Sequence, residues 1–442
     1  MLCEQMPLRY VLIVNRMFMK ILRNIFFAGF VAVGVSLPAA GPMTTGYTFA
    51  ECEGSAMPYP YSGPPAEYPD SLEPVFINHV GRHGARFPAS SANCLKLKRA
   101  LEHADSIGTI TPLGRRLRSV NDRIIALSNN RWGSLDSLGM AEQAEIAARM
   151  FFGYTGVFSS GGTIRAMSSY SPRAMMSMYC FVHQLDRLNN RVTFETVTGR
   201  VTSPLLRPFD LDRDYIDFRK SDAWKAPYDE YMDAAVPLSA LRRVLGDGYR
   251  FESEDDARDM AMTEYSVLSG MSAMGLESVM ARFFTREEAN ALWSCNNLRQ
   301  YLQRTATTVS AVPADIASAL VSDIIATTDA FVNGTDGETR AILRFGHAET
   351  LMPLLSLIRI PGCYYLTNYF DTVGSHWCNF HVVPMASNIQ FVVFKSRKSG
   401  LCYVRINLNE QPVKLRKGSN EIYYPWGELR RYLTDCLPLT AQ

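Results

Sequence analysis

A segment with strand character, a short polar turn and an amphipathic helix follow one another three times along this chain. The segments with strand character are residues 74–80, 162–167 and 341–345. The helices that follow begin after Ser90 or Ser91, at Pro172 and at Ala348, and a capping serine or an early proline is typical of a helix start. Strands that alternate with helices in this way predict a parallel or mostly parallel sheet with helices on its faces.

In a sheet of this kind, ligands bind outside the carboxyl ends of the strands. Helix N-termini at that edge contribute free N–H groups and the positive end of the helix dipole, and both favour anions. Each of the three turns is associated with histidine or arginine, so we expect them to meet in one anion site. Its candidate residues are Arg82, His83, Arg86, Arg173 and His347.

The first turn contains the pattern RHGxRxP, in which His83 lies between Arg82 and Arg86. Two guanidinium groups neutralise a phosphate monoester and match its oxygens bidentately. His83 can attack phosphorus through one ring nitrogen while the other donates to a backbone carbonyl, and the arginines favour the neutral imidazole. Gly84 allows a tight bend of the backbone. The pattern resembles the fingerprint of the histidine acid phosphatases.

The third turn reads His347-Ala348-Glu349, whereas the histidine phosphatase superfamily usually has an acid directly after the histidine. The His-Ala-Glu version is similar to that of the multiple inositol polyphosphate phosphatases, a branch of phytases. The resemblance implies that His347 holds the phosphoryl group and that Glu349 is the proton donor. General chemistry agrees, because an inositol alkoxide is a poor leaving group that needs an acid. The alternative for Glu349 is a carboxylate that only stabilises the helix dipole.

Three further residues complete the set of candidates. The tract SSYSPR, which ends in Arg173, resembles the downstream arginine motif of the same family and implies a phosphate clamp. Lys96 belongs to a basic cluster with Lys98 and Arg99, which either extends the anion site or forms a solvated helix face. His79 either lines the site or belongs to the core.

No metal or other cofactor is expected, because the arginines supply the charge neutralisation that a metal ion would give. His376 and His381 flank Cys378 but lack a third ligand, and the motifs HExxH, GxxxxGK[ST] and GxSxG are absent. Eight cysteines follow residue 41, and the sequence leaves open whether they form disulfides or remain free thiols.

The N-terminal part of the chain predicts export. Residues 25–37 form an apolar run of 13 residues that follows Lys20 and Arg23 and precedes small residues. This run is shorter than the ~20 residues of a membrane-spanning helix, so we expect a signal peptide over residues 1–41, with an uncleaved anchor as the alternative. The expected protein is periplasmic or secreted and is not attached to a membrane after cleavage.

Composition and hydrophobic periodicity divide the rest of the chain into three expected regions. Residues 42–72 form a Pro-rich arm, and residues 73–200 and 305–442 form the α/β domain. A helical insert domain over residues 205–300 is expected to lie over the active site. Residues 388–395 and 402–408 are expected to complete the sheet, with residues 409–413 as their hairpin connection.

The formal net charge of the 442 residues is +2, which indicates no nucleic-acid or membrane-surface partner, and we expect a monomer. The resemblance implies a histidine phosphatase-like, phosphoglycerate mutase-like fold. It also implies metal-independent hydrolysis of inositol hexakisphosphate (phytate) and lower inositol phosphates through a phosphohistidine. The alternatives are a broad-specificity acid phosphatase or 2,3-bisphosphoglycerate phosphatase, and a non-catalytic exported protein that binds phosphorylated ligands.

Overall fold

The structure of the chain, a computed structural model, describes residues 46–64, 66–159, 161–189, 191–416 and 418–439. The expected signal peptide over residues 1–41 and the start of the Pro-rich arm lie outside these ranges. Within them, no helix combines the length and the apolar character needed to cross a membrane.

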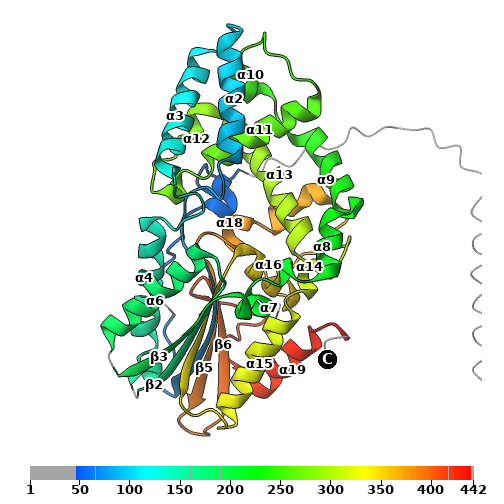
Figure 1. Cartoon of the computed structure of the whole chain (residues 1–442). Helices are drawn as coiled ribbons and strands as arrows, with labels where there is room; N and C mark the ends of the chain where they lie inside the picture. Colours follow the sequence, from blue (N-terminus) through cyan, green and yellow to red (C-terminus); the bar gives the residue numbers. More distant parts are fainter. Residues whose placement is uncertain (1–45, 65, 160, 190, 417, 440–442) are drawn as a thin grey trace, which may run out of the picture. The chain divides into compact units, whose positions relative to one another are not determined.

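One mixed sheet forms the centre of the α/β part (Figure 1). Its strands are β1 (Leu72–Arg82), β2 (Gly162–Ser168), β3 (Val192–Val197), β4 (Thr339–Gly346), β5 (Asn388–Ser396), β6 (Cys402–Leu408), β7 (Gln411–Pro412) and β8 (Tyr424–Pro425). The order is β3-β2-β4-β1-β5-β6-β7, with β8 paired to β6. Strands β3, β2, β4 and β1 are parallel, which confirms the expected parallel core, whereas β5 to β8 pair antiparallel.

The late strands join the same sheet as expected, but their connection differs from the prediction. Strands β5 and β6 are joined by residues 397–401 and not by residues 409–413. Asn409 and Glu410 instead turn β6 into β7, with φ angles of 48° and 68°. The polar residues of 409–413 do indicate a turn, and the prediction was wrong only about which strands this turn joins.

Helices cover both faces of the sheet (Figure 1). On one face, α4 (Ser137–Gly153), α5 (Thr155–Ser159) and α6 (Pro172–Leu188) pack with the sheet residues Ile164 and Leu343 in one apolar cluster. On the other face lie α15 (Ser318–Val332), α16 (Ala348–Leu357) and α19 (Trp426–Asp435). The helices α6 and α16 begin directly after β2 and β4, in agreement with the predicted strand-to-helix turns.

A second group of helices forms its own apolar core, which we call the helical cluster. It contains α2 (Ala92–Ser106), α3 (Pro112–Ser128), α10 (Ser239–Leu245), α11 (Glu254–Leu268), α12 (Met280–Phe283), part of α13 (Arg286–Arg304) and the 3-10 helix η1 (Glu51–Ala56). The expected insert over residues 205–300 does not include α2, α3 or η1. Leu97 and Leu117 share one buried cluster with Leu241 and Leu268, so separate parts of the chain build this region.

The remaining short elements connect these parts. They are α7 (Ser203–Leu206), α8 (Arg213–Lys220), α9 (Asp222–Ala235), α14 (Val312–Asp315), α17 (Val373–His376), α18 (Asn379–Val382), and the 3-10 helices η2 (Arg200–Thr202), η3 (Pro208–Asp210), η4 (Ser272–Met274) and η5 (Phe370–Thr372). The eight cysteines among the described residues are all free thiols.

Candidate active site

The loop after β1 presents the first histidine. His83 is 3% exposed, and its backbone N–H donates to the carbonyl of Gly346 at the end of β4 over 3.1 Å. Its Nδ1 lies 2.9 Å from the carbonyl oxygen of Gly84. A carbonyl only accepts, so Nδ1 carries the proton and Nε2 keeps its lone pair. Burial, followed by the charges of Arg82 and Arg173, lowers the pKa of His83 well below its ordinary value.

Gly84 serves a close approach of two backbones. A Cβ atom at Gly84 would lie 2.4 Å from the carbonyl oxygen of Gly139 on α4. The φ angle of Gly84 is not positive, so the requirement comes from packing and not from the tight bend that the sequence suggested. Helix α4 therefore presses directly against the loop that carries His83.

Two polar side chains of α4 form hydrogen bonds with the backbone of this loop. The Glu142 carboxylate accepts 2.7 Å hydrogen bonds from the N–H groups of Ala85 and Tyr59. Gln143 Nε2 donates to the carbonyl of Arg82 over 2.9 Å. Sequence reasoning missed both residues, because a single acid or amide on an amphipathic helix gives no signal of what it contacts.

Three arginines surround His83 with unsatisfied donors. Arg82 Nη1 donates to the carbonyls of Ser55 and Val383, each over 2.6 Å, and Arg86 Nη1 donates to that of Phe87 over 2.8 Å. The Nε atoms of Arg82, Arg86 and Arg173 are buried and have no partner within the described residues. Burial and then the charges of neighbouring arginines lower the pKa of Arg82 to about 9 and that of Arg86 to about 10. Buried, unpaired and mutually repelling cations indicate a site that an anion completes.

The second histidine lies opposite the first. The rings of His347 and His83 have centroids 5.6 Å apart, and the backbone N–H of His347 is fixed by Thr350 Oγ1 at 3.0 Å. Burial, followed by the charge of Arg173, lowers the pKa of His347 to about 3, so its ring is neutral. Arg207 Nη1 and Ser169 Oγ lie 2.9 and 2.8 Å from Nε2, and Arg173 Nη2 lies 3.4 Å from Nδ1. Two guanidinium groups therefore flank the His347 ring.

Glu349 is the second residue of α16, and its Oε1 accepts a hydrogen bond from Arg304 Nη2 at 2.8 Å. Burial alone would raise the pKa of Glu349, but the charge of Arg304, a backbone hydrogen bond and the charge of Arg82 outweigh it and hold the pKa at about 2. This carboxyl is therefore ionised at neutral and mildly acidic pH.

Most of these side chains line one cavity of about 360 Å³ between the strand ends and the helical cluster, whereas His347 and Arg207 are not among its lining residues. The expected residues in its wall are Arg82, His83, Arg86, Arg173 and Glu349. Sequence reasoning missed Arg299, Arg304 and Glu53, which also line it, and it missed Arg207 beside His347. None of the four belongs to a recognisable motif.

Two weaker candidates lie elsewhere. His79 is 1% exposed, with ring centroids 5.3 Å from those of Phe181 and Phe345, so it belongs to the core between β1 and α6. Lys96 forms an ion pair with Asp259 of α11 and does not line the cavity. Neither side chain lines the cavity of about 360 Å³. The described residues include no group of three or more His, Cys, Asp or Glu that could hold a metal ion.

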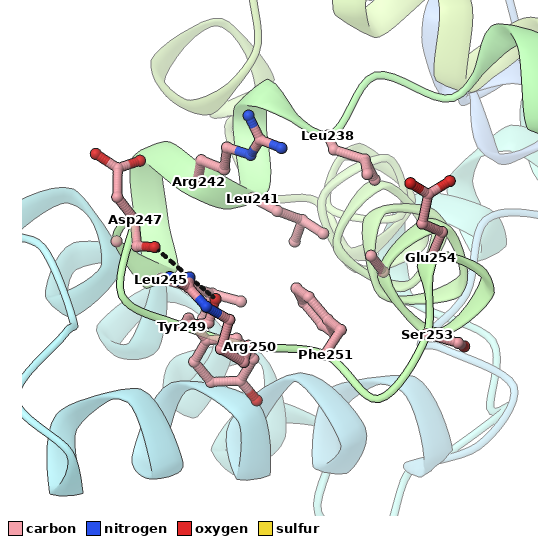
Figure 2. Close-up of a pocket in the computed structure, with 12 residues that line it drawn as sticks. Leu238, Leu241, Arg242, Leu245, Asp247, Tyr249, Arg250, Phe251, Ser253 and Glu254 are labelled. Carbon is pink, nitrogen blue, oxygen red and sulfur yellow. Dashed lines mark hydrogen bonds between the residues drawn. The ribbon is translucent and has the colours of Figure 1, made fainter.

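A second cavity, of about 540 Å³, lies within the helical cluster between α10 and α11 (Figure 2). Leu241 and Phe251 point into it. Arg250 already donates to the backbone carbonyls of Asp247 and Tyr249, at 2.5 and 3.1 Å. This larger cavity lacks unsatisfied buried arginines of the kind found around His83, so its chemistry does not match that of the anion site.

The fold and the site together define a class of protein. In this class, two neutral imidazoles and several buried guanidinium groups form an anion-binding site at the edge of an α/β sheet. The family model of the histidine phosphatase superfamily (branch 2) matches residues 75–409. The chain belongs to this family.

Several known proteins are similar to it. The multiple inositol polyphosphate phosphatase 1 of Gallus gallus is 25% identical over 393 residues, which cover 81% of this chain and 85% of that protein. The Homo sapiens protein of the same name is 24% identical over 418 residues, with coverage of 85% and 83%.

Two solved structures share the fold. The Bifidobacterium longum multiple inositol polyphosphate phosphatase in complex with inositol hexasulfate has a TM-score of 0.74 at 20% identity, with coverage of 88% of this chain and 99% of that one. The phytase from D. castellii has a TM-score of 0.70 at 18% identity, with coverage of 92% and 90%.

Proposed function

We propose that this protein hydrolyses phosphomonoesters of inositol polyphosphates, phytate among them, through a phosphohistidine and without a metal ion. One observation carries the proposal. The Nδ1 proton of His83 is committed to the Gly84 carbonyl, and buried arginine donors without partners surround the ring. This arrangement leaves Nε2 as a nucleophile inside an anion site.

In the first step, Nε2 of His83 attacks phosphorus, the P–N bond forms and the ester P–O bond breaks. Arg82, Arg86, Arg173 and His347 stabilise the charge on the phosphoryl oxygens. Glu349 gives its proton to the departing alkoxide. In the second step, Glu349 takes a proton from water as the water oxygen attacks phosphorus, and the P–N bond breaks to restore His83.

The proton that Glu349 transfers must come with the substrate. The pKa of Glu349 is about 2, so the enzyme holds a carboxylate before substrate binds. A phosphate monoester carries one proton below its second pKa of about 6, and this proton can pass to Glu349 once the phosphate meets the arginines. Proton supply therefore favours mildly acidic conditions.

The charge of the cavity supports a substrate with more than one phosphate. Arg299 and Arg304 line it in addition to the three arginines around His83, whereas Glu53 and Glu349 are its only acids. The relatives named above act on inositol polyphosphates by their names, and one structure of the same fold is a complex with inositol hexasulfate. A broad acid phosphatase or a 2,3-bisphosphoglycerate phosphatase would need the same catalytic groups, and a simple binder would not need Glu349.

The test is phosphate release from phytate at mildly acidic pH in excess chelator. Release that is lost in His83→Ala supports the proposal. Release from p-nitrophenyl phosphate but not from phytate would reduce the function to that of a general acid phosphatase. Binding of phytate without release from either compound would favour the non-catalytic alternative.

We also propose that the protein is exported to the periplasm or beyond, that it has no membrane attachment after cleavage, and that it acts as a monomer. The apolar run at residues 25–37 and its basic flank support export. Cell fractionation combined with N-terminal sequencing tests this, and a full-length protein in the cytoplasm would contradict it. Light scattering of the purified protein tests the oligomeric state.

A further inference from the structure

An arginine at the C-terminal end of α13 contacts the proposed proton donor. Arg304 is the last residue of α13, and Glu349 lies in the first turn of α16. Their side chains are 19% and 30% exposed and form an ion pair at 2.8 Å across the cavity wall. Arg304 Nε is buried and has no partner within the described residues. Arg304 therefore has donors to spare beside the carboxyl.

Charged or titratable groups face Glu349 from each element packed around it. They are Arg304 from α13, His347 at the start of α16, Arg82 at the end of β1, Arg86 from the loop that follows, and Arg173 from α6. His347 is neutral, and Arg82 and Arg86 are anchored to backbone carbonyls around the nucleophile. Within this set, Arg304 alone has a direct hydrogen bond to the Glu349 carboxylate.

We propose that Arg304 is a positioning residue that holds Glu349 toward the leaving oxygen and keeps it unprotonated until a phosphorylated substrate arrives. The inference rests on the proposed function and deepens it. The substrate phosphate binds to the free donors of Arg304 and draws the guanidinium away from Glu349. The ion pair between Arg304 and Glu349 weakens, and the Glu349 carboxyl takes the proton that the substrate carries. The donor is thereby loaded only when there is an alkoxide to receive the proton.

The direction of the pH effect follows from proton counting. The productive complex holds one proton between the substrate phosphate and Glu349. A second proton, taken up when the pH falls below the pKa of Glu349, leaves one proton on the transferred phosphate and removes a negative charge that the arginines bind, so kcat/KM should decline on the acid side. Without Arg304 the pKa of Glu349 rises, and this acid decline moves to higher pH.

The experiment compares Arg304→Gln, Glu349→Gln and the double variant on phytate, whose leaving group is an alkoxide, and on p-nitrophenyl phosphate, whose leaving group barely needs a proton. We expect Arg304→Gln to lower kcat/KM on phytate by about 10- to 100-fold, a part of what a general acid contributes. On p-nitrophenyl phosphate, kcat/KM, which does not include hydrolysis of the phosphohistidine, should change by less than about threefold. The acid decline of kcat/KM should move upward, and the double variant should be no slower than Glu349→Gln.

Arg299→Gln is the matched control, because Arg299 lies on the same helix and lines the same cavity without a hydrogen bond to Glu349. Arg299→Gln should raise KM for phytate. It should not selectively slow release of the alkoxide leaving group, and it should not shift the pH at which kcat/KM declines on the acid side. Arg304→Lys keeps the positive charge, so the acid decline of kcat/KM should lie close to its position in the parent protein. Circular dichroism and thermal unfolding show whether each variant is folded, and Arg304→Lys keeps the test valid if Arg304→Gln folds poorly.

Two outcomes overturn the inference. Equal slowing of both substrates by Arg304→Gln with an unchanged pH profile would mean that Arg304 only binds phosphate. Independent, multiplicative effects of Arg304→Gln and Glu349→Gln would mean that Arg304 does not act through Glu349. In both cases Glu349→Gln still spares kcat/KM for the aryl substrate, although it slows hydrolysis of the phosphohistidine that both substrates form. If Glu349→Gln itself shows no such preference, the proton donor of the proposed function is wrong, and the inference fails with it.

Discussion

Helix α4 approaches the loop of His83 so closely at Gly139 that alanine at this position should displace the loop. A Cβ atom there would lie 2.1 Å from the carbonyl oxygen and 2.6 Å from the nitrogen of Ala85, and 2.8 Å from the carbonyl carbon of Gly84. Ordinary contacts begin near 3.4 Å. All three atoms belong to the backbone, so no side-chain rotation relieves the overlap, and helix and loop must separate by roughly 1 Å.

This displacement reaches the nucleophile directly. His83 precedes Gly84, and its ring is oriented by the Gly84 carbonyl, so a shift of the loop changes the direction from which Nε2 meets phosphorus. A misplacement of ~1 Å can cost about 100-fold in rate. Overpacking of a buried contact costs about 1–3 kcal/mol of stability. We therefore expect Gly139→Ala to lower kcat on phytate by about 100-fold while the protein remains folded.

The assay pairs steady-state turnover of phytate with urea unfolding of the same preparation. Gly427→Ala is the matched control, because Gly427 also lies in the first turn of a helix, α19, and a Cβ atom there meets nothing within 4 Å. It should leave kcat unchanged and stabilise the protein by at most about 1 kcal/mol. Gly139→Ala with turnover and stability close to those of the parent protein would refute the argument.

Three other predictions concern buried groups that can carry a charge. Glu142→Gln leaves the N–H of either Ala85 or Tyr59 without its acceptor, so it should destabilise the protein by about 1–3 kcal/mol and lower kcat, measured by urea unfolding and phytate turnover; an unchanged kcat would remove Glu142 from loop positioning. Burial raises the pKa of Glu264 from 4.5 to about 8, so the folded state keeps a proton that the unfolded state releases. Stability should fall as pH rises through this window, by up to about 1.4 kcal/mol per pH unit, and Glu264→Gln should flatten the unfolding profile. Inorganic phosphate at a hundredfold excess over Kd should stabilise the folded protein by about 2.7 kcal/mol, which is measured as a higher unfolding temperature. An equal rise in the Arg173→Ala variant would contradict the assignment of Arg173 as a phosphate contact.

Local sequence patterns predicted the strand-to-helix turns, because their signals lie within a few residues. Pro172 is the first residue of α6 and His347 is the N-cap of α16, as the turn chemistry indicated. The orientation of β5 and β6 relative to β1 had no such signal, since short apolar strands read alike whether they pair parallel or antiparallel. The partnership of α2 and α3 with α10 and α11 depends on contacts between distant segments and was likewise not predicted.

The same distinction separates the site residues that were found from those that were missed. His83 and its arginines lie in one contiguous pattern, so their chemistry could be inferred from spacing. Arg304 meets Glu349 across 45 positions, and Arg207 meets His347 across 140. An isolated arginine on a helix or in a loop has no local context that distinguishes it from a solvated one.

The displacement of the acid from position 348 to position 349 determines which part of the fold controls the proton donor. Ala348 is 5% exposed and joins the apolar cluster of α16 at the wall of the cavity, whereas the Glu349 side chain forms an ion pair with Arg304 at the end of α13. The nucleophile and the phosphoryl contacts are held by β1, α4 and α6, but the donor is held by α13. Substitutions that shift α13 against α16 should therefore alter leaving-group dependence more than phosphate affinity. Substitutions beneath the His83 loop should slow alkyl and aryl phosphates alike.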